Sequence, residues 1–86
     1  MKFKLSTMLS VRKIENEIFV YNRKDSRIHC FNETGAFLWE CVEKSDNSFH
    51  IIQQLINTYE VDHLDAEKDT ITFLEQLRDV GLVDIE

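Results

Sequence analysis

The sequence predicts an α+β fold in which a small antiparallel sheet is followed by three helices. Up to about residue 31, apolar and polar residues alternate, or β-branched and aromatic residues cluster, in short runs typical of strands. Beyond that point the apolar residues recur at helical spacing. The 86 residues, 43% of them hydrophobic and 30% charged, fit one globular domain that spans residues 1–86.

Three strands are expected in the first third of the chain. Alternation is clearest in the first of them, and Ile18 to Tyr21 in the second is apolar enough for a well-buried strand. Both connections are short and polar, which favours an antiparallel meander. The expected strands cover about 9–14, 17–22 and 27–31.

Three helices are expected to follow, over about 33–43, 48–59 and 65–80. The first is apolar over most of its circumference, so we expect it to be deeply buried with Trp39 in the core. The other aromatic residues of the helical part are also expected to be mostly core. Residues 82–85 form an apolar tail that should pack back on the core.

Capping residues mark the helix ends. Asn32 is the expected N-cap of the first helix and Ser48 of the second, while Asp62 or Asp65 can cap the third. Gly81 supplies the left-handed residue that commonly follows the end of a helix.

The charge balance and the cysteine content exclude several classes of protein. Ten Lys and Arg residues against 16 Asp and Glu residues give a net charge of −6, which argues against a nucleic-acid partner. No apolar run approaches the ~20 residues of a membrane-spanning helix, and no signal peptide is recognisable. Cys30 and Cys41 form no disulfide framework, so a cytoplasmic address is expected.

No catalytic or metal-binding constellation stands out. The three histidines, His29, His50 and His63, fall in three different elements, and neither C-x-x-C nor H-x-x-x-H occurs. Neither cysteine has an obvious base or an electropositive setting in the sequence. We therefore expect no enzyme activity, no metal and no cofactor.

Two features point to a peptide-binding groove. The third strand carries one charge and no proline, so its edge is a template for an incoming strand if it is open. On a helical wheel of the third helix, Asp69 and Gln76 lie along one border of the stripe centred on Phe73 and Leu77. A carboxylate there either lines a groove between helix and sheet or is simply solvated.

Several short motifs resemble the PqqD-like family. Residues 31–36, F-N-E-T-G-A, with Trp39 are similar to the family's L-N-x-T-G-A-x-x-W signature. The run from Asp69 to Leu82 is similar to D-x-x-x-F-L-x-x-L-x-x-x-G-L, and residues 59–62 match Y-x-V-D. The resemblance covers nearly the whole chain.

The resemblance implies a winged-helix-like fold that binds the leader of a ribosomally synthesised precursor peptide and presents it to a modifying enzyme. Members of the family have no catalytic activity. The leader is expected to add as a strand to the third strand, in the groove formed with the third helix. The implied peptide-binding residues are Arg27, Ile28, His29, Cys30, Phe31, Asp69, Thr72, Phe73 and Gln76.

Two departures from the family pattern bear on the modifying enzyme. Phe31 replaces the usual leucine, and Gly81-Leu82 stands where members that make pyrroloquinoline quinone tend to have Gly-Trp. The Thr-Gly-Ala run at 34–36 with Trp39 looks more like the small free-standing proteins of lasso-peptide clusters. In those clusters the leader is handed to a separate transglutaminase-like cysteine peptidase. Across the family, a radical-SAM enzyme is the other usual partner.

Two further classes remain as alternatives. A winged helix can bind nucleic acid, but this requires a basic recognition helix, and the third helix is mostly acidic. A dimerisation module would use the same strand edge to form a homodimer.

Overall fold

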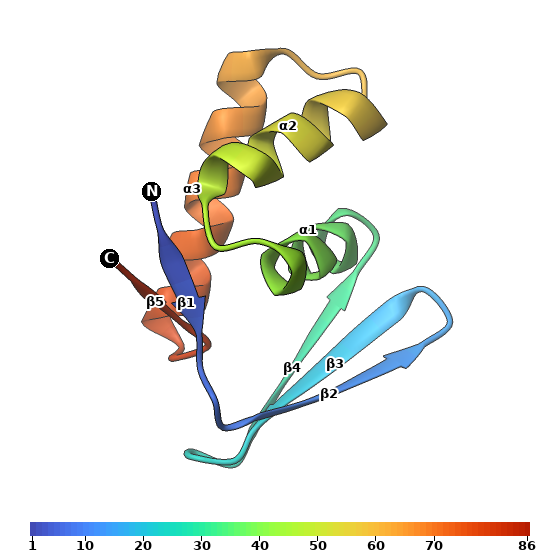
Figure 1. Ribbon diagram of the computed structural model, residues 1–86. Helices are drawn as coiled ribbons and strands as arrows, with labels where there is room; N and C mark the ends of the chain where they lie inside the picture. Colours follow the sequence, from blue (N-terminus) through green and yellow to red (C-terminus); the bar gives the residue numbers. More distant parts are fainter.

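The computed structural model describes residues 1–86 and contains two small sheets and three helices (Figure 1). The chain passes through β1 (Phe3–Leu5), β2 (Leu9–Ile14), β3 (Glu17–Asn22), β4 (Arg27–Asn32), α1 (Thr34–Lys44), α2 (Ser48–Thr58), α3 (His63–Asp79) and β5 (Val83–Ile85). Helix α1 lies across the end of β4, α2 lies beyond α1, and α3 runs down past both toward the β1–β5 pair (Figure 1). The predicted α+β class is confirmed.

Strands β2, β3 and β4 form the expected antiparallel meander in that order. Val20 in the middle strand lies opposite Val11 on one side and His29 on the other. Only one face of β3 is buried, because Ile18 and Val20 are almost inaccessible while Tyr21 is 37% exposed. The prediction of a well-buried second strand was therefore right for alternate residues only.

A second sheet, which the sequence pattern did not predict, joins the two ends of the chain. Strands β1 and β5 pair antiparallel, with Lys4 opposite Asp84, and the N- and C-termini consequently lie side by side (Figure 1). The apolar tail does pack on the core, since Leu82 and Val83 are buried, and it does so as a strand that also buries Phe3.

Two of the expected caps were wrong. Asn32 is still part of β4, so Glu33 occupies the N-cap position of α1 with a φ of 50° and no side-chain hydrogen bond. At α2 the cap is Asn47, whose Oδ1 accepts a 3.0 Å hydrogen bond from the N–H of Phe49. Ser48 is instead the first residue of that helix, where it is buried. Each helix boundary thus lies one residue from the position that the polar residues suggested.

Helix α3 begins earlier than expected and ends as expected. Asp62 caps it, with Oδ1 accepting a 2.9 Å hydrogen bond from the N–H of Asp65. At the other end Gly81 has a φ of +81°, and the N–H of Leu82 donates to the carbonyl of Leu77 at 2.8 Å. This is the hydrogen bond of a Schellman motif, so the predicted glycine C-cap is confirmed.

The core is one cluster to which both sheets and all three helices contribute. Trp39 of α1 is completely buried at its centre, as expected. Two aromatic residues expected in the core lie outside it, since Phe49 is 57% exposed and Tyr59 is 37% exposed. The cluster consists of Phe3, Ile18, Val20, Ala36, Leu38, Trp39, Cys41, Val42, Ile51, Ile52, Leu55, Ala66, Leu74, Leu77, Leu82 and Val83.

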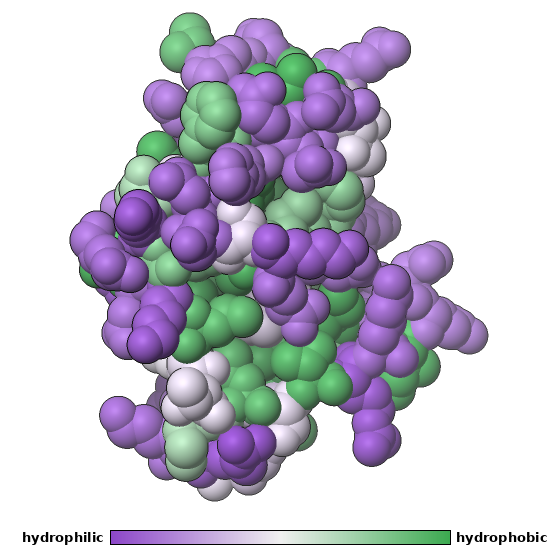
Figure 2. Space-filling model, in the orientation of Figure 1, coloured by the Kyte–Doolittle hydropathy of each residue, from purple (hydrophilic) through white to green (hydrophobic).

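Polar residues cover most of the upper, helical part of the face seen in Figure 2, whereas apolar residues gather in its middle and lower parts, over the strands. No helix has a stretch both long and apolar enough to cross a membrane.

Candidate functional site

The outer edge of β4 is the feature of the sheet that can take another strand. β4 is the last strand of the meander and pairs only with β3, and the β1–β5 pair forms a separate sheet. Six residues, Arg27–Asn32, therefore present backbone N–H and C=O groups along an edge that no strand covers. The expected open edge is present.

The side chains of β4 alternate between the two faces of the sheet. His29 lies opposite Val20 and Phe31 opposite Ile18, both buried, so these two side chains face the helices. Ile28 and Cys30 face the other way, and Ile28 is 68% exposed. The strand residues that the sequence grouped together are thus divided between the two faces, and the side chains of Ile28 and Cys30 lie on the face turned away from the helices.

An aromatic ladder joins the strand to two helices. The ring of Phe31 stacks on Trp39 with centroids 5.5 Å apart and an interplanar angle of 9°. On its other side Phe31 meets the ring of Phe73 edge to face, again at 5.5 Å and at 66°. Because such pairs contribute about 0.5–1.5 kcal/mol beyond area burial, the ladder fixes α3 beside the end of β4. The sequence suggested Trp39 only as a core residue, and its ring also packs against the ring of Phe31 and holds it in place.

The contact between Phe31 and Phe73 shows which border of α3 lies toward β4. At 100° per residue, Asp69 and Gln76 lie on the Phe73 side of the buried stripe, as the helical wheel predicted. Both are exposed, and Thr72 lies further round toward solvent. The structure therefore places Asp69, Phe73 and Gln76 on one border of α3, facing β4.

An open trough lies past the start of β4. It has a volume of about 970 Å³ and lies between the two sheets, where Arg27 begins β4 and residues 78–81 end α3. Its charged lining residues are Lys4, Lys24, Asp25, Arg27, Arg78, Asp79 and Asp84. Apart from Arg27 the sequence singled out none of these, because they come from four separate segments that only the fold brings together.

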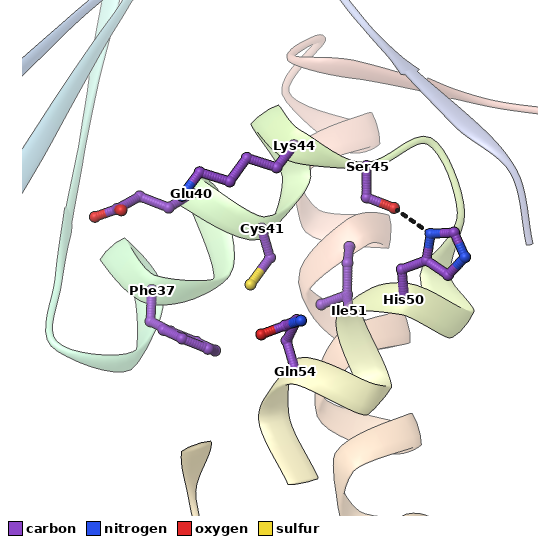
Figure 3. A pocket seen from close by; sticks show the side chains of 8 residues that line it. All are labelled: Phe37, Glu40, Cys41, Lys44, Ser45, His50, Ile51 and Gln54. Carbon is purple, nitrogen blue, oxygen red and sulfur yellow. Dashed lines mark hydrogen bonds between the residues drawn. The ribbon is translucent and has the colours of Figure 1, made fainter. Parts of the chain in front are cut away.

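A second cavity, of about 470 Å³, lies between α1 and α2 (Figure 3). The thiol of Cys41 and the amide of Gln54 point toward it, and Ser45 Oγ lies 3.4 Å from His50 Nδ1 at its rim. Burial raises the pKa of the Cys41 thiol, so this group is protonated and weakly nucleophilic at neutral pH. None of the predicted site residues lines this cavity.

Two candidates for chemistry remain, the Cys30 thiol and a metal site. Partial desolvation, together with a hydrogen bond to Glu17 and the charge of that carboxylate, raises the pKa of the Cys30 thiol. Its Sγ donates to Glu17 Oε2 at 3.5 Å. No group of three or more His, Cys, Asp and Glu side chains is arranged to hold a metal ion.

Comparison with known proteins defines the class. Residues 17–83 match the family model described as coenzyme PQQ synthesis protein D (PqqD), so the chain belongs to the PqqD family. Among curated proteins, no sequence is similar enough to count as a relative.

Two solved structures share the fold. One is described as TbiB1 in complex with the TbiA(beta) leader peptide, with a TM-score of 0.90, 20% identity and 96% of each chain covered. The other is described as lasso peptide synthetase B1 complexed with the leader peptide, with a TM-score of 0.86 and 21% identity over 99% of this chain and 100% of that one. At these identities the similarity concerns the fold.

Proposed function

We propose that this protein binds the leader of a ribosomally synthesised precursor peptide as an additional strand on β4 and presents it to a modifying enzyme. The observation that carries the proposal is the open edge of β4 beside the border of α3 that holds Phe73. Membership of the PqqD family supports it, as do the leader complexes formed by the two proteins of the same fold. The protein acts without catalysis and without a cofactor, in the cytoplasm where ribosomal peptides are made.

The proposed residues divide into two roles. The backbone of Arg27 to Phe31 supplies hydrogen bonds to the leader strand, and Phe31 with the α3 border supplies the apolar and polar walls of the groove. Each hydrogen bond contributes about 0.5–1.5 kcal/mol net, whereas ordering one leader residue costs about 1–2 kcal/mol. Backbone pairing alone therefore does not give stable binding. The α3 border is formed by Asp69, Phe73 and Gln76, with Thr72 further round toward solvent.

Apolar side chains of the leader must make up the difference. Burying one Leu-sized or Phe-sized side chain gains about 1.5–3 kcal/mol, so two or three of them against Phe31 and Phe73 supply about 3–9 kcal/mol toward that shortfall. Since strand side chains alternate, these leader residues are expected at every second position.

The opposite face of the sheet is where we propose that the modifying enzyme docks. It carries exposed apolar side chains, with Ile14 50%, Tyr21 37% and Ile28 68% exposed, next to half-buried Phe19. A leader strand on β4 would extend this face without a break, because every second leader side chain points to the same side. The partner that we propose is a transglutaminase-like cysteine peptidase, and a radical-SAM enzyme is the alternative.

An amide-resolved NMR titration tests the leader site. The labelled protein is titrated with the leader of the short precursor peptide encoded beside its gene. We expect shifts to concentrate in Arg27–Phe31 and along the 69–76 border of α3. Shifts confined to the cavity between α1 and α2 would refute the β4 site.

A second experiment separates leader binding from presentation. Tyr21→Glu, on the outer face, should leave leader affinity unchanged while slowing processing of the precursor by the peptidase encoded nearby. Equal processing by this variant and by the unmodified protein would refute the docking face. Gel filtration at increasing protein concentration detects the alternative use of the edge, a homodimer through β4, which the leader should dissociate.

A further inference from the structure

Charge is distributed very unevenly along the chain. Residues 1–32 hold seven of the ten Lys and Arg residues but only three of the 16 Asp and Glu residues, for a net charge of +4. Residues 33–86 consequently carry −10. The proposed groove lies on the boundary between these parts, because β4 belongs to the first and α3 to the second.

The two ends of the groove differ in charge as a result. β4 and α3 run in opposite directions, since Phe31 meets Phe73 while Arg27 shares the trough with residues 78–81 (Figure 1). Beyond Phe31 lie the start of α1 and the first half of α3, and this end is here called the acidic end. Its carboxylates are Glu33, Asp62, Asp65 and Asp69. Lys68, the one Lys or Arg in this half of α3, lies about 140° round the helix from Phe73.

Stabilisation of the N-terminus of α3 explains only some of these four carboxylates. Asp62 and Asp65 serve the N-terminus of α3, one as the cap and the other in the first turn. Asp69 lies in the second turn, beyond the reach of that effect. None of the four carboxylates forms a salt bridge within the protein, because the three ion pairs of the structure lie elsewhere.

The other end, here called the basic end, is the trough at the start of β4. Four Lys and Arg residues line it against three Asp residues, which reverses the acidic excess of the whole chain. Arg78 is paired with Asp79 at 3.5 Å, and Lys4 lies opposite Asp84 in the β1–β5 register. Lys24 and Arg27 have no salt-bridge partner. Besides Asp79 and Asp84, the only carboxylate that lines the trough is that of Asp25.

The distance between the ends lets a bound peptide sense them separately. A strand of six residues spans about 20 Å at ~3.3 Å per residue. The Debye length at physiological ionic strength is about 8 Å, so charges at one end are largely screened from those at the other.

We infer that the groove selects a leader with cationic residues immediately before its strand-forming segment and acidic residues immediately after it. This inference rests on the proposed function and gives the ligand a direction. All strand pairs in the protein are antiparallel, and an antiparallel leader on β4 enters at the acidic end and leaves through the basic trough. Charge order together with the apolar anchors then fixes the register of the strand.

The test uses two synthetic peptides with the same composition. One is the leader of the precursor encoded beside the gene, and the other has the charged residues before and after its apolar segment exchanged. Affinities are measured from the fluorescence of Trp39, the only tryptophan, at low and high salt. We expect the exchanged peptide to bind at least about fivefold more weakly at low salt, with the difference shrinking at high salt.

Charge reversal in the protein supplies the matched control. Asp69→Lys should weaken binding of the natural leader about three- to tenfold, and changing the leader's cations before the strand to Glu should restore it. Glu75→Lys makes the same change of net charge on another side of α3 and should alter affinity less than about twofold.

The outcomes distinguish this inference from the proposed function. Equal binding of the two peptides, or equal effects of Asp69→Lys and Glu75→Lys, would overturn the charge selection and leave leader binding intact. A leader that binds while carrying acidic residues before its strand would do the same. Failure of the natural leader to bind at all would overturn the proposed function itself.

Discussion

Replacing Phe73 by alanine tests the link between the fold and the groove most directly. Phe73 is half-buried on the border of α3 and holds the ring of Phe31 edge to face at 5.5 Å. Truncating a fully buried phenylalanine costs about 3–5 kcal/mol, so a half-buried one should cost about 2 kcal/mol. A chain of 86 residues has a free energy of unfolding of roughly 4–13 kcal/mol, and the variant should therefore fold at 25 °C.

The substitution should weaken leader binding even though the variant stays folded. The substitution removes one wall of the apolar groove and leaves Phe31 held on one side only, by Trp39. Losing most of the contact with one leader side chain corresponds to about 1.4 kcal/mol or more, which is at least a tenfold increase in Kd. Calorimetric titration with the leader measures the affinity, and urea unfolding followed by Trp39 fluorescence measures the stability.

Ile71→Ala is the matched control. Ile71 is also half-buried on α3, but it lies across the buried stripe from Phe73. The two variants should lose comparable stability, while Ile71→Ala keeps the affinity for the leader. A folded Phe73→Ala protein with unchanged affinity would refute the groove, and an equal loss of affinity in both variants would mean that α3 acts only through stability.

Three further predictions concern the strand edge, the end of α3 and the exposed thiol. His29→Pro and Cys30→Pro each remove one backbone N–H group, and these two groups point to opposite edges of β4. The variant that loses the N–H on the open edge should keep its fold, as measured by circular dichroism, and lose leader binding. Retained binding in every folded variant would exclude strand addition. Gly81→Ala, at a φ of +81°, should lower the free energy of unfolding by about 1–2 kcal/mol in urea titrations, and an unchanged value would show that the turn relaxes. Glu17→Gln should lower the pKa of the Cys30 thiol, so its alkylation by iodoacetamide near pH 8, followed by mass spectrometry, should be faster than in the unmodified protein.

The sequence determined the elements that depend on local pattern. Alternation and short polar turns located the meander, and helical spacing located the helices, because both signals arise within a few neighbouring residues. The same reasoning placed Asp69 and Gln76 along one border of the apolar stripe of α3, and it marked the edge of the third strand as a template for pairing if that edge is open. Capping by Asn47 rather than Ser48 shows the limit of such signals, since adjacent polar residues are equally able to cap.

The tertiary structure alone decided how distant segments meet. The β1–β5 sheet pairs Phe3 with Ile85. Strands of three residues are too short for an alternation of apolar and polar residues to predict such a pairing. Likewise, the stacking of Phe31 on Trp39 and the trough that gathers Lys24, Arg27 and Arg78 follow from closure of the core. Burial of apolar surface is non-directional, so the sequence determines which residues must be inside while only the packed fold determines which of them touch.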